Sequence, residues 1–514
     1  MANWSGMIRQ VVIAALIAMA GPMTAAHANK ANDTMVVALQ RGILSVDYNY
    51  STKREYIFLS ELTDDGLFFI HPDTLKPAPL VAKSYKWADD LTLNVEIRPG
   101  IRFHDGSALT ADDVVYSYRF TLDPKNQTDR GKQYNEWLAG IEKTGPMSVR
   151  FKLKYMYPLA LTSLGRGIPM RKRGAYDADL AAGRIPNGQV LNGVGPYRVV
   201  KLEPGKSTIV ERFEGYYKDS PKGRPAIKRI EMREIPDWGT QQAEIISGGV
   251  QWMYDVPTDV ATNLGQSGQV TYLNGPDMRI GFLILDAAGN TSKGGPLTKL
   301  AVRRAINHAI NRESIVKNVV KGGAEALHTA CHPNQFGCVQ DVMKYSYDPA
   351  KAKALLTEAG YPGGITLDLW VYREKETAEA VAADLTKAGI KTQIRFVQLT
   401  SLDKARKEHQ IPAYFATWGS GGLADVQGMS NHFLPTTDRN MTGDPKVSEY
   451  MIGGQKFREE AKRLDLYSKG VKLMAEQAYW APLYTFTVNY LTSKDLDFPV
   501  PKDGVPLLYR ARWK

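Results

Sequence analysis

The chain has 514 residues, of which 43% are apolar, and its formal net charge is +11 at pH 7. Because single hydrophobic cores stop growing near roughly 250 to 300 residues, this length predicts two or three domains. The basic residues are scattered, which indicates a solvated basic surface and argues against a nucleic-acid-binding stripe. We therefore expect a globular protein with no nucleic-acid partner, whose positive balance modestly favours anionic partners.

Residues 1–28 have the pattern of a secretory signal peptide. A basic residue precedes the apolar run at 11–20, and Ala26 and Ala28 form an A-x-A cleavage site. The run is shorter than the ~20 residues that span a bilayer, so we expect a cleaved leader and no membrane anchor. No cysteine precedes Cys331, so the leader offers no site for a lipid. A secreted chain without an anchor points to a Gram-negative periplasm.

Two segments in the first third of the chain alternate apolar and polar residues strictly. They are residues 91–97, with Leu91 on the apolar face, and residues 149–155. This period of two predicts half-buried strands, because successive side chains of a strand point to opposite faces of its sheet.

The segment after the first of these strands contains a histidine beside an aspartate, His104 and Asp105, followed by a cluster of acids. A metal or catalytic site would need a third ligand at useful spacing, and none is present. The alternative is architectural. His104 and Asp105 precede a glycine and have the composition of a turn, and Thr110 with Asp113 forms a capping box for a helix. We favour the architectural interpretation.

Cys331 and Cys338 lie close together in HTACHPNQFGC. In an oxidising compartment, a disulfide that closes this loop should contribute about 2 kcal/mol in the chain-entropy model. The alternative is zinc, since His328 and His332 are also ligand types, but the spacing matches no standard finger or ribbon. We expect a disulfide and no metal.

The pattern changes in the second half of the chain. Residues 365–372 alternate, a helical segment follows and stops at Gly389, and residues 391–399 alternate again. This order predicts a βαβ unit with parallel strands. A further helix is expected between Asp348, as its N-cap, and Gly360.

Residues 75–120 resemble, almost residue for residue, the signature region of the family 5 extracellular solute-binding proteins. These are the periplasmic receptors of the oligopeptide, dipeptide and nickel ABC transporters. The block at 192–206 is similar to the family's G-T-G-P-Y block, with Val194 in place of threonine. Other segments resemble the family's remaining blocks in the same order: residues 45–50, 297–316, 347–364 and 479–490.

The resemblance implies an α/β fold of the two-lobed periplasmic-binding-protein (Venus flytrap) type, with an extra domain, as in the dipeptide- and oligopeptide-binding proteins. Two crossing segments would form the hinge. The implied ranges are 29–53, 190–279 and 483–514 for lobe I, 54–189 for the extra domain and 280–482 for lobe II.

The implied function is that of the substrate-binding component of an ABC importer. It would capture a peptide or peptide-like solute between the lobes and deliver it to membrane permease subunits with their ATPases, as a monomer without a cofactor. The same role for an opine, a sugar conjugate or another anionic solute is an alternative. A periplasmic chaperone or signalling receptor is another. A secreted hydrolase is disfavoured, because the sequence has no G-x-S-x-G and no H-E-x-x-H motif.

Ligands of open α/β sheets bind beyond the carboxyl ends of the strands. In lobe II these ends are Arg373 and the loop that begins at Trp418. By the resemblance, Trp418 would cover an apolar group, Gly419 would let the ligand approach closely, and Arg373 would bind a carboxylate. Asp47 and Tyr48 would meet the ligand from lobe I. Each residue has an alternative: core packing for Trp418, a solvated loop for Arg373 and a turn for Asp47.

The sequence departs from the family where an aspartate normally binds the ammonium of a peptide. Peptide-binding members have a pattern similar to W-x-G-D at this point. In this chain Trp418 is followed by Gly-Ser-Gly-Gly, and the next acidic residue is Asp425. A free amine would need Asp425 or Asp47 as its partner, because an unpaired buried ammonium is strongly disfavoured. The aromatic residues Trp137, Trp238 and Tyr134 could also line a cleft, although core packing is the default for them.

Overall fold

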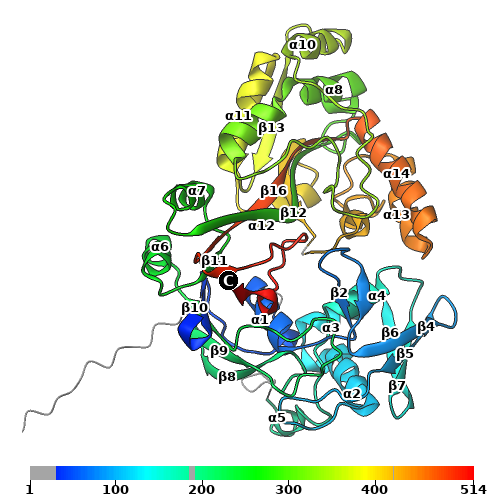
Figure 1. Cartoon of the computed structure of the whole chain (residues 1–514). Helices are drawn as coiled ribbons and strands as arrows, with labels where there is room; N and C mark the ends of the chain where they lie inside the picture. The colour runs from blue at the N-terminus through cyan, green and yellow to red at the C-terminus, as the bar shows by residue number, and fades with distance from the viewer. Residues whose placement is uncertain (1–29, 52, 185–191, 421) are drawn as a thin grey trace, which may run out of the picture.

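The computed structural model describes residues 30–51, 53–184, 192–420 and 422–514. The predicted signal peptide, residues 1–28, lies outside these residues. The chain forms two parts, drawn one above the other in Figure 1, with a long pair of strands between them. The upper part carries helices α8 (Leu300–Ala309), α10 (Pro349–Glu358), α11 (Lys375–Lys387), α13 (Pro445–Gly453) and α14 (Glu460–Glu476), and the lower part carries α1 (Arg54–Thr63), α2 (Ala111–Leu122) and α4 (Ala160–Gly165).

Within the described residues, ten strands form one continuous sheet that passes through both lobes. β13 pairs in parallel with β14 and β15 in lobe II, and β1 pairs in parallel with β10 and β11 in lobe I. In sheet order the strands are β14 (Ile390–Phe396), β13 (Ile365–Val371), β15 (Ala413–Gly419), β12 (Thr271–Leu285), β16 (Trp480–Thr492), β11 (Trp252–Tyr254), β1 (Thr34–Leu39), β10 (Arg229–Glu234), β9 (Ser207–Arg212) and β8 (Tyr197–Glu203).

The two crossing segments are β12 and β16, which pair antiparallel along most of their length. Asn274 faces Asn489 at the lobe I end, and Ile284 faces Trp480 at the lobe II end. The register shifts between Pro276 and Ile280. Proline donates no backbone hydrogen bond, and an irregular register bends a strand pair, so this break lies where a hinge would flex.

The extra domain is built around an antiparallel sheet of β4 (Ala82–Trp87), β5 (Thr92–Ile97), β7 (Ser148–Leu153) and β6 (Leu138–Gly145). Both predicted strands are therefore present as β5 and β7. The prediction is wrong for Leu91, whose side chain is 41% exposed because it lies in the turn before β5. Tyr155 lies beyond the end of β7 and is also exposed.

The predicted capping box is confirmed at the start of α2. The backbone N–H of Thr110 donates to Asp113 Oδ2 over 2.8 Å. His104 lies in the preceding turn, where its Nδ1 accepts from the N–H of Gly193 and its Nε2 donates to the carbonyl of Gly195. Burial lowers the pKa of His104 to about 4. Its ring thus joins two chain segments.

The predicted βαβ unit of lobe II is confirmed as β13, α11 and the parallel strand β14. The second strand is shorter than predicted, because it ends at Phe396 and Leu399 begins helix α12 (Leu399–Lys407). Asp348 caps α10 as predicted by accepting from the N–H of Lys351 over 2.8 Å. Gly360 follows the helix with a φ of +89°, which suits glycine.

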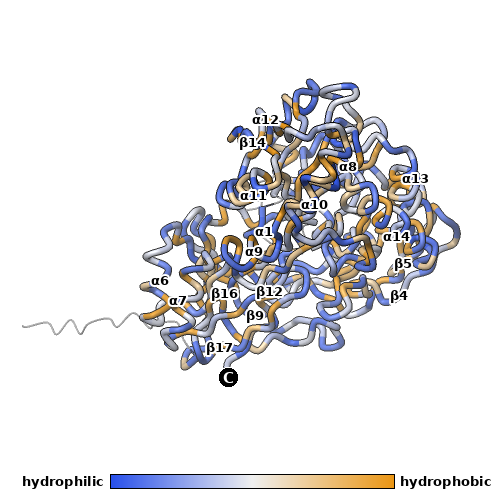
Figure 2. The backbone as a smooth tube through the Cα atoms, turned by 90° about the horizontal axis from the view of Figure 1, so that it is seen from above, coloured by the Kyte–Doolittle hydropathy of each residue, from blue (hydrophilic) through white to orange (hydrophobic). Residues whose placement is uncertain are grey.

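The predicted disulfide is confirmed between Cys331 and Cys338, whose Cα atoms are 5.7 Å apart. Among the described residues, no group of three or more histidine, cysteine, aspartate or glutamate side chains could hold a metal ion. No described helix is both long and apolar enough to cross a bilayer. Figure 2 shows short apolar segments alternating with polar ones throughout the fold.

Helix α1 packs differently from what the expected domain ranges suggest. Its residues Tyr56, Phe58 and Leu62 lie in the same hydrophobic core as Met35 of β1 and Trp252 of β11. This core belongs to lobe I, whereas the expected range places α1 in the extra domain. Trp137 and Tyr134 are each 2% exposed in the separate core of the extra domain, as the core interpretation predicts.

Candidate solute-binding site

The carboxyl ends of β13 and β15 lie side by side at one edge of the lobe II sheet. Val371 pairs with Phe415 in parallel, so Arg373 and Gly419 follow at the same end of the sheet. The hydroxyl of Tyr372 lies 3.2 Å from Thr417 Oγ1 and ties the two strands together there. The fold thus brings together three of the predicted site residues: Arg373, Trp418 and Gly419.

These three residues differ in how exposed they are and in what they contact. Trp418 is half-buried, and its ring lies against Gly428, where an added Cβ would be 3.0 Å from the indole. Gly419 is exposed, and a Cβ there would lie 3.2 Å from Arg279 Nε. The side chain of Arg373 is 40% exposed and donates to Glu374 Oε1 over 3.0 Å. The indole also packs against a hydrophobic core of lobe II, so it is partly packed and partly exposed.

Charged residues of β12 lie next to these strand ends. Asp277 is 3.6 Å from the guanidinium of Arg279 and 3.7 Å from that of Arg54, so both ion pairs are looser than a hydrogen bond. Burial raises the pKa of Asp277, while Arg54, Arg279 and Arg373 oppose this rise. The sequence reasoning missed Arg279. Its signal was a pair of charges, Asp277 and Arg279, inside an otherwise uncharged strand.

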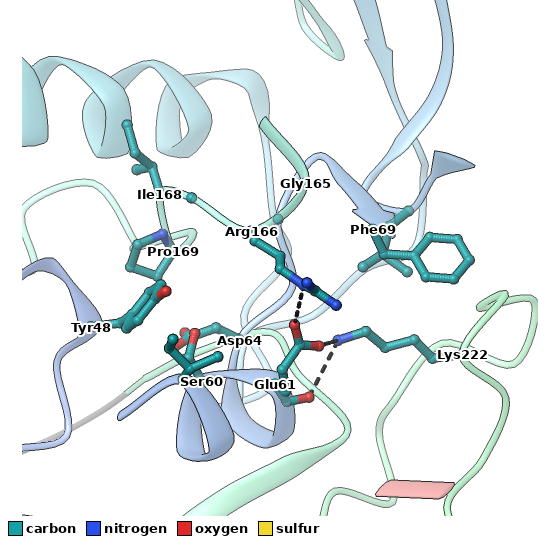
Figure 3. Close-up of a pocket in the computed structure, with 14 residues that line it drawn as sticks. Tyr48, Ser60, Glu61, Asp64, Phe69, Gly165, Arg166, Ile168, Pro169 and Lys222 are labelled. Atoms are coloured by element: carbon teal, nitrogen blue, oxygen red, sulfur yellow. Dashed lines mark hydrogen bonds and ion pairs between the residues drawn. The ribbon is translucent and has the colours of Figure 1, made fainter. Parts of the chain in front are cut away.

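Figure 3 shows a small cavity, next to Tyr48, that is lined by paired charges from lobe I and the extra domain. Glu61 of α1 lies 3.4 Å from Arg166 Nε and 3.5 Å from Lys222 Nζ. Tyr48 borders the same small cavity, of about 30 Å³, and the guanidinium carbon of Arg130 lies 3.7 Å from the centre of its ring. The cavity has room for little more than a water molecule, so it cannot hold a solute in this conformation.

Asp47 is almost fully buried in a network of its own. Its carboxylate accepts from Arg171 Nη2 over 3.3 Å, from the hydroxyl of Tyr176 and from the backbone N–H of Asn49. It also caps the short helix η2 (Tyr48–Tyr50). This geometry matches the alternative in which Asp47 fixes a turn, and a ligand contact of Asp47 stays a prediction.

Asp425 is likewise engaged by an arginine. Nη2 of Arg463, on α14, lies 2.9 and 2.8 Å from its two carboxylate oxygens. Burial raises the pKa of Asp425, and the attraction to Arg463 opposes that rise. Asp425 also caps η6 (Val426–His432) by accepting from the N–H of Gln427. Its partner lies 38 residues later in the chain, so no local pattern could have revealed the pair.

A cavity of about 370 Å³ lies between the extra domain and lobe II. The extra domain contributes Tyr85 and Trp87, and lobe II contributes Phe336, Leu423 and Asp425. It is therefore bordered by the loop that follows Trp418 and Gly419. Two cross-domain contacts lie at its rim. They are the ion pair of Lys76 with Glu460 at 3.0 Å and the guanidinium of Arg458, 3.7 Å from the centre of the Trp87 ring.

A model of the bacterial extracellular solute-binding proteins, family 5 Middle, matches residues 76–440. The chain belongs to this family. Family 5 proteins are periplasmic solute-binding components that work with ABC permeases and ATPases, so this chain is a binding protein of an importer and not an enzyme.

Three similar proteins illustrate the family. The glutathione-binding protein GsiB of Escherichia coli K12 is 26% identical over 486 residues, covering 88% of this chain and 90% of GsiB. The heme-binding protein A of Haemophilus influenzae is 27% identical over 444 residues, covering 79% of this chain and 78% of that protein. The solved structure of HbpA2 from Haemophilus parasuis has a TM-score of 0.83 and 20% identity, covering 94% of this chain and all of that one. Its fold is the two-lobed fold that the sequence predicts.

Proposed function

We propose that this family 5 protein captures a peptide or peptide-like solute between its lobes and delivers it to a membrane permease. The observation that carries the proposal is the position of Arg373, Trp418 and Gly419. They lie together at one end of the lobe II sheet, and the loop that follows them borders a cavity between two domains. Closure would bring lobe I against a solute held there, and the solute would favour the closed form by its contacts with both lobes.

The side chains at this edge favour a solute with both a carboxylate and an apolar group. Arg373 and Arg279 present guanidinium groups whose ion pairs are exposed or loose, so a solute carboxylate can compete for them. The exposed part of the Trp418 indole suits an apolar group. Tyr85 and Phe336 give the neighbouring cavity an apolar lining of its own. A free carboxyl terminus with a neighbouring side chain fits this arrangement.

The same geometry raises a second candidate, a solute that has no free amine. Asp47 and Asp425 are the carboxylates expected to bind an ammonium, and each is already held by a buried arginine. An incoming ammonium would have to displace Arg171 or Arg463, which would leave a buried guanidinium without its partner at a cost of several kcal/mol. An amine-blocked peptide, an opine or a sugar conjugate avoids this cost.

The relatives supply the first solutes to try, because one is named for glutathione and another for heme. Micromolar affinity corresponds to about 8 kcal/mol of net binding free energy. One aromatic contact and several charge-assisted hydrogen bonds can supply this amount.

The proposal is tested by melting the purified protein with glutathione, with Met-Leu, which is bound in the solved structure of a dipeptide-binding protein from Pseudoalteromonas, with their N-acetylated forms and with hemin. We expect at least one peptide to raise the melting temperature with concentration, as RT ln(1 + [L]/Kd) requires, and N-acetylation to preserve the shift. The peptide recovered afterwards should be intact. A shift with hemin alone would contradict a peptide ligand, and cleavage of the peptide would contradict a binding role.

We further propose that the protein works as a monomer, that residues 1–28 are removed on export without lipid attachment, and that the lobe ranges given above hold, with α1 added to lobe I. The intact mass of protein purified from the periplasm tests the processing, since it should correspond to residues 29–514. Light scattering at micromolar concentration tests the monomer.

A further inference from the structure

The disulfide between Cys331 and Cys338 closes a small loop that lies at the candidate site. Cys331 is fully buried and Cys338 is 9% exposed. Within the loop, the N–H of Gln335 donates to the carbonyl of His332 over 2.9 Å, and the N–H of Cys338 donates to the carbonyl of Gln335 over 3.1 Å. The residues between the two cysteines therefore form a compact, hydrogen-bonded turn.

The backbone of this loop is joined to the solute-binding loop that follows Trp418 and Gly419. The N–H of Phe336 donates to the carbonyl of Ala424 over 2.9 Å, and the N–H of Val426 donates to the carbonyl of Phe336 over 3.0 Å. Phe336 and Asp425 thus form a parallel β-bridge. The side-chain amide of Gln335 also donates to the carbonyl of Leu423 over 3.4 Å. Four consecutive residues, 423–426, are braced in this way.

The other side of the loop packs against α14. Gly337 has a φ of +87°, and a Cβ at this position would lie 2.6 Å from the ring of Tyr467, so only glycine fits. The ring of Phe336 lies 5.1 Å from the guanidinium carbon of Arg463, the residue that holds Asp425. The loop therefore contacts both the binding loop and the arginine that fixes its carboxylate.

One contact of the loop crosses to lobe I. The side-chain amide of Asn334 donates to the carbonyl of Lys502 over 3.2 Å, and Lys502 lies in the C-terminal segment assigned to that lobe. The loop is thus in a position to affect lobe closure as well as the shape of the lobe II surface.

We propose that the disulfide loop 331–338 is a positioning element for the solute-binding loop, so that solute affinity depends on the Cys331–Cys338 bond. Cutting the crosslink gives the loop more conformations, and the two backbone hydrogen bonds of Phe336 then open more often. The inference rests on the proposed role of residues 418–425 in binding. Its structural part, the bracing of residues 423–426, can be tested without any solute.

The structural test is hydrogen exchange of the unliganded protein and of the double variant Cys331→Ser/Cys338→Ser. We expect the protection factor of the Val426 amide to fall at least tenfold, while the protection factors of amides in β13 fall much less. Asp348→Ala is the matched control. It destabilises the same lobe by removing the cap of α10, but it has no contact with the loop, so Val426 should keep its protection. Unchanged protection of Val426 in the double variant, or a loss no larger than in β13, would overturn the proposal.

Gln335→Ala keeps the disulfide and tests the same contact if the double variant does not fold. This variant should lower the protection of residues 423–425 by more than that of amides in β13. Protection equal to that of the unmodified protein would contradict the positioning role.

The binding test compares the dissociation rates of glutathione and Met-Leu from the unmodified protein, the double variant and the Asp348→Ala control. We expect dissociation at least fivefold faster in the double variant alone. Equal rates, with the loss of Val426 protection observed, would overturn the link to affinity. If the unmodified protein binds neither probe, the peptide assignment fails, whereas the exchange result still decides whether the loop braces residues 423–426.

Discussion

The two walls of the candidate site use charge in opposite ways. Where lobe I meets the extra domain, Asp47 and Arg171 form a buried pair with side-chain exposures of 1% and 4%, and Asp64 lies 2.5 Å from the same guanidinium. At the lobe II strand ends, Arg373 is 40% exposed, and Arg279 of the crossing strand β12 lies 3.6 Å from the carboxylate of Asp277. The charges around Asp47 are thus already paired within the protein, whereas those at the lobe II strand ends can still gain from a solute carboxylate.

This difference assigns separate tasks to the two walls. Buried charge pairs keep a surface in one shape, because breaking them exposes each partner to an apolar surrounding. Loose or exposed pairs cost little to rearrange, so they can exchange one carboxylate for another. The network around Asp47 would therefore offer a rigid surface on closure, and the residues at the lobe II strand ends would provide the charged contacts that select the solute.

The largest expected effect comes from breaking the buried network of Asp47, Asp64 and Arg171. Arg171→Ala leaves the Asp47 and Asp64 carboxylates buried without their cation, which should lower the free energy of unfolding by about 3 to 5 kcal/mol. Urea unfolding of both proteins measures this change. Arg173→Ala is the matched control, because Arg173 is exposed two residues later, and it should change stability by less than about 0.5 kcal/mol. A similar loss of stability in both variants would contradict a specific role of the buried network in stability.

The next effect concerns the aromatic residue of lobe II. Trp418→Ala should weaken solute binding about thirtyfold, which corresponds to roughly 2 kcal/mol for a central aromatic contact. The melting temperature of the unliganded protein should fall by only a few degrees, because the indole is half-buried. Calorimetric titration and thermal melts separate the two effects, with Trp238→Ala in lobe I as the control. A large loss of unliganded stability would assign Trp418 to the core.

The smallest effect concerns a single charged contact. Arg373→Ala should weaken binding of a solute with a free carboxylate about tenfold, as for one hydrogen bond to a charged group, and less so at high salt. Binding of the same solute with its carboxyl group amidated should not change. Arg395→Ala is the control, because Arg395 is an exposed arginine of the neighbouring strand that pairs with Asp368. Equal losses for both solutes would argue against a carboxylate contact.

Local patterns were enough to predict much of the fold. The capping box of Thr110 and Asp113 and the cap at Asp348 depend on residues a few positions apart, so the sequence displays them directly. The disulfide was predictable because the two cysteines are close together and no better partner exists. The errors lie at element ends. Leu91 continues the alternating pattern, but the turn before β5 exposes it.

The charged partners of the site could not be predicted from the sequence. Arg463 reaches Asp425 from a helix 38 residues later, and Arg171 reaches Asp47 from 124 residues away. Pairs that are this far apart in the sequence depend on how whole domains pack. A single sequence carries no local signal for them. Family resemblance led to the prediction that Arg373, Trp418 and Gly419 bind the solute, but it gave no indication that Asp425 is already paired with Arg463.

The most direct test of the account is a crystal structure of the protein purified from its own periplasm together with the solute that it retains. We predict an intact solute between the lobes, with its carboxylate on Arg373 or Arg279 and an apolar group against Trp418. Asp47 and Asp425 should keep their arginine partners. A solute bound away from the lobe II strand ends, or one held through its ammonium by Asp425, would contradict the account.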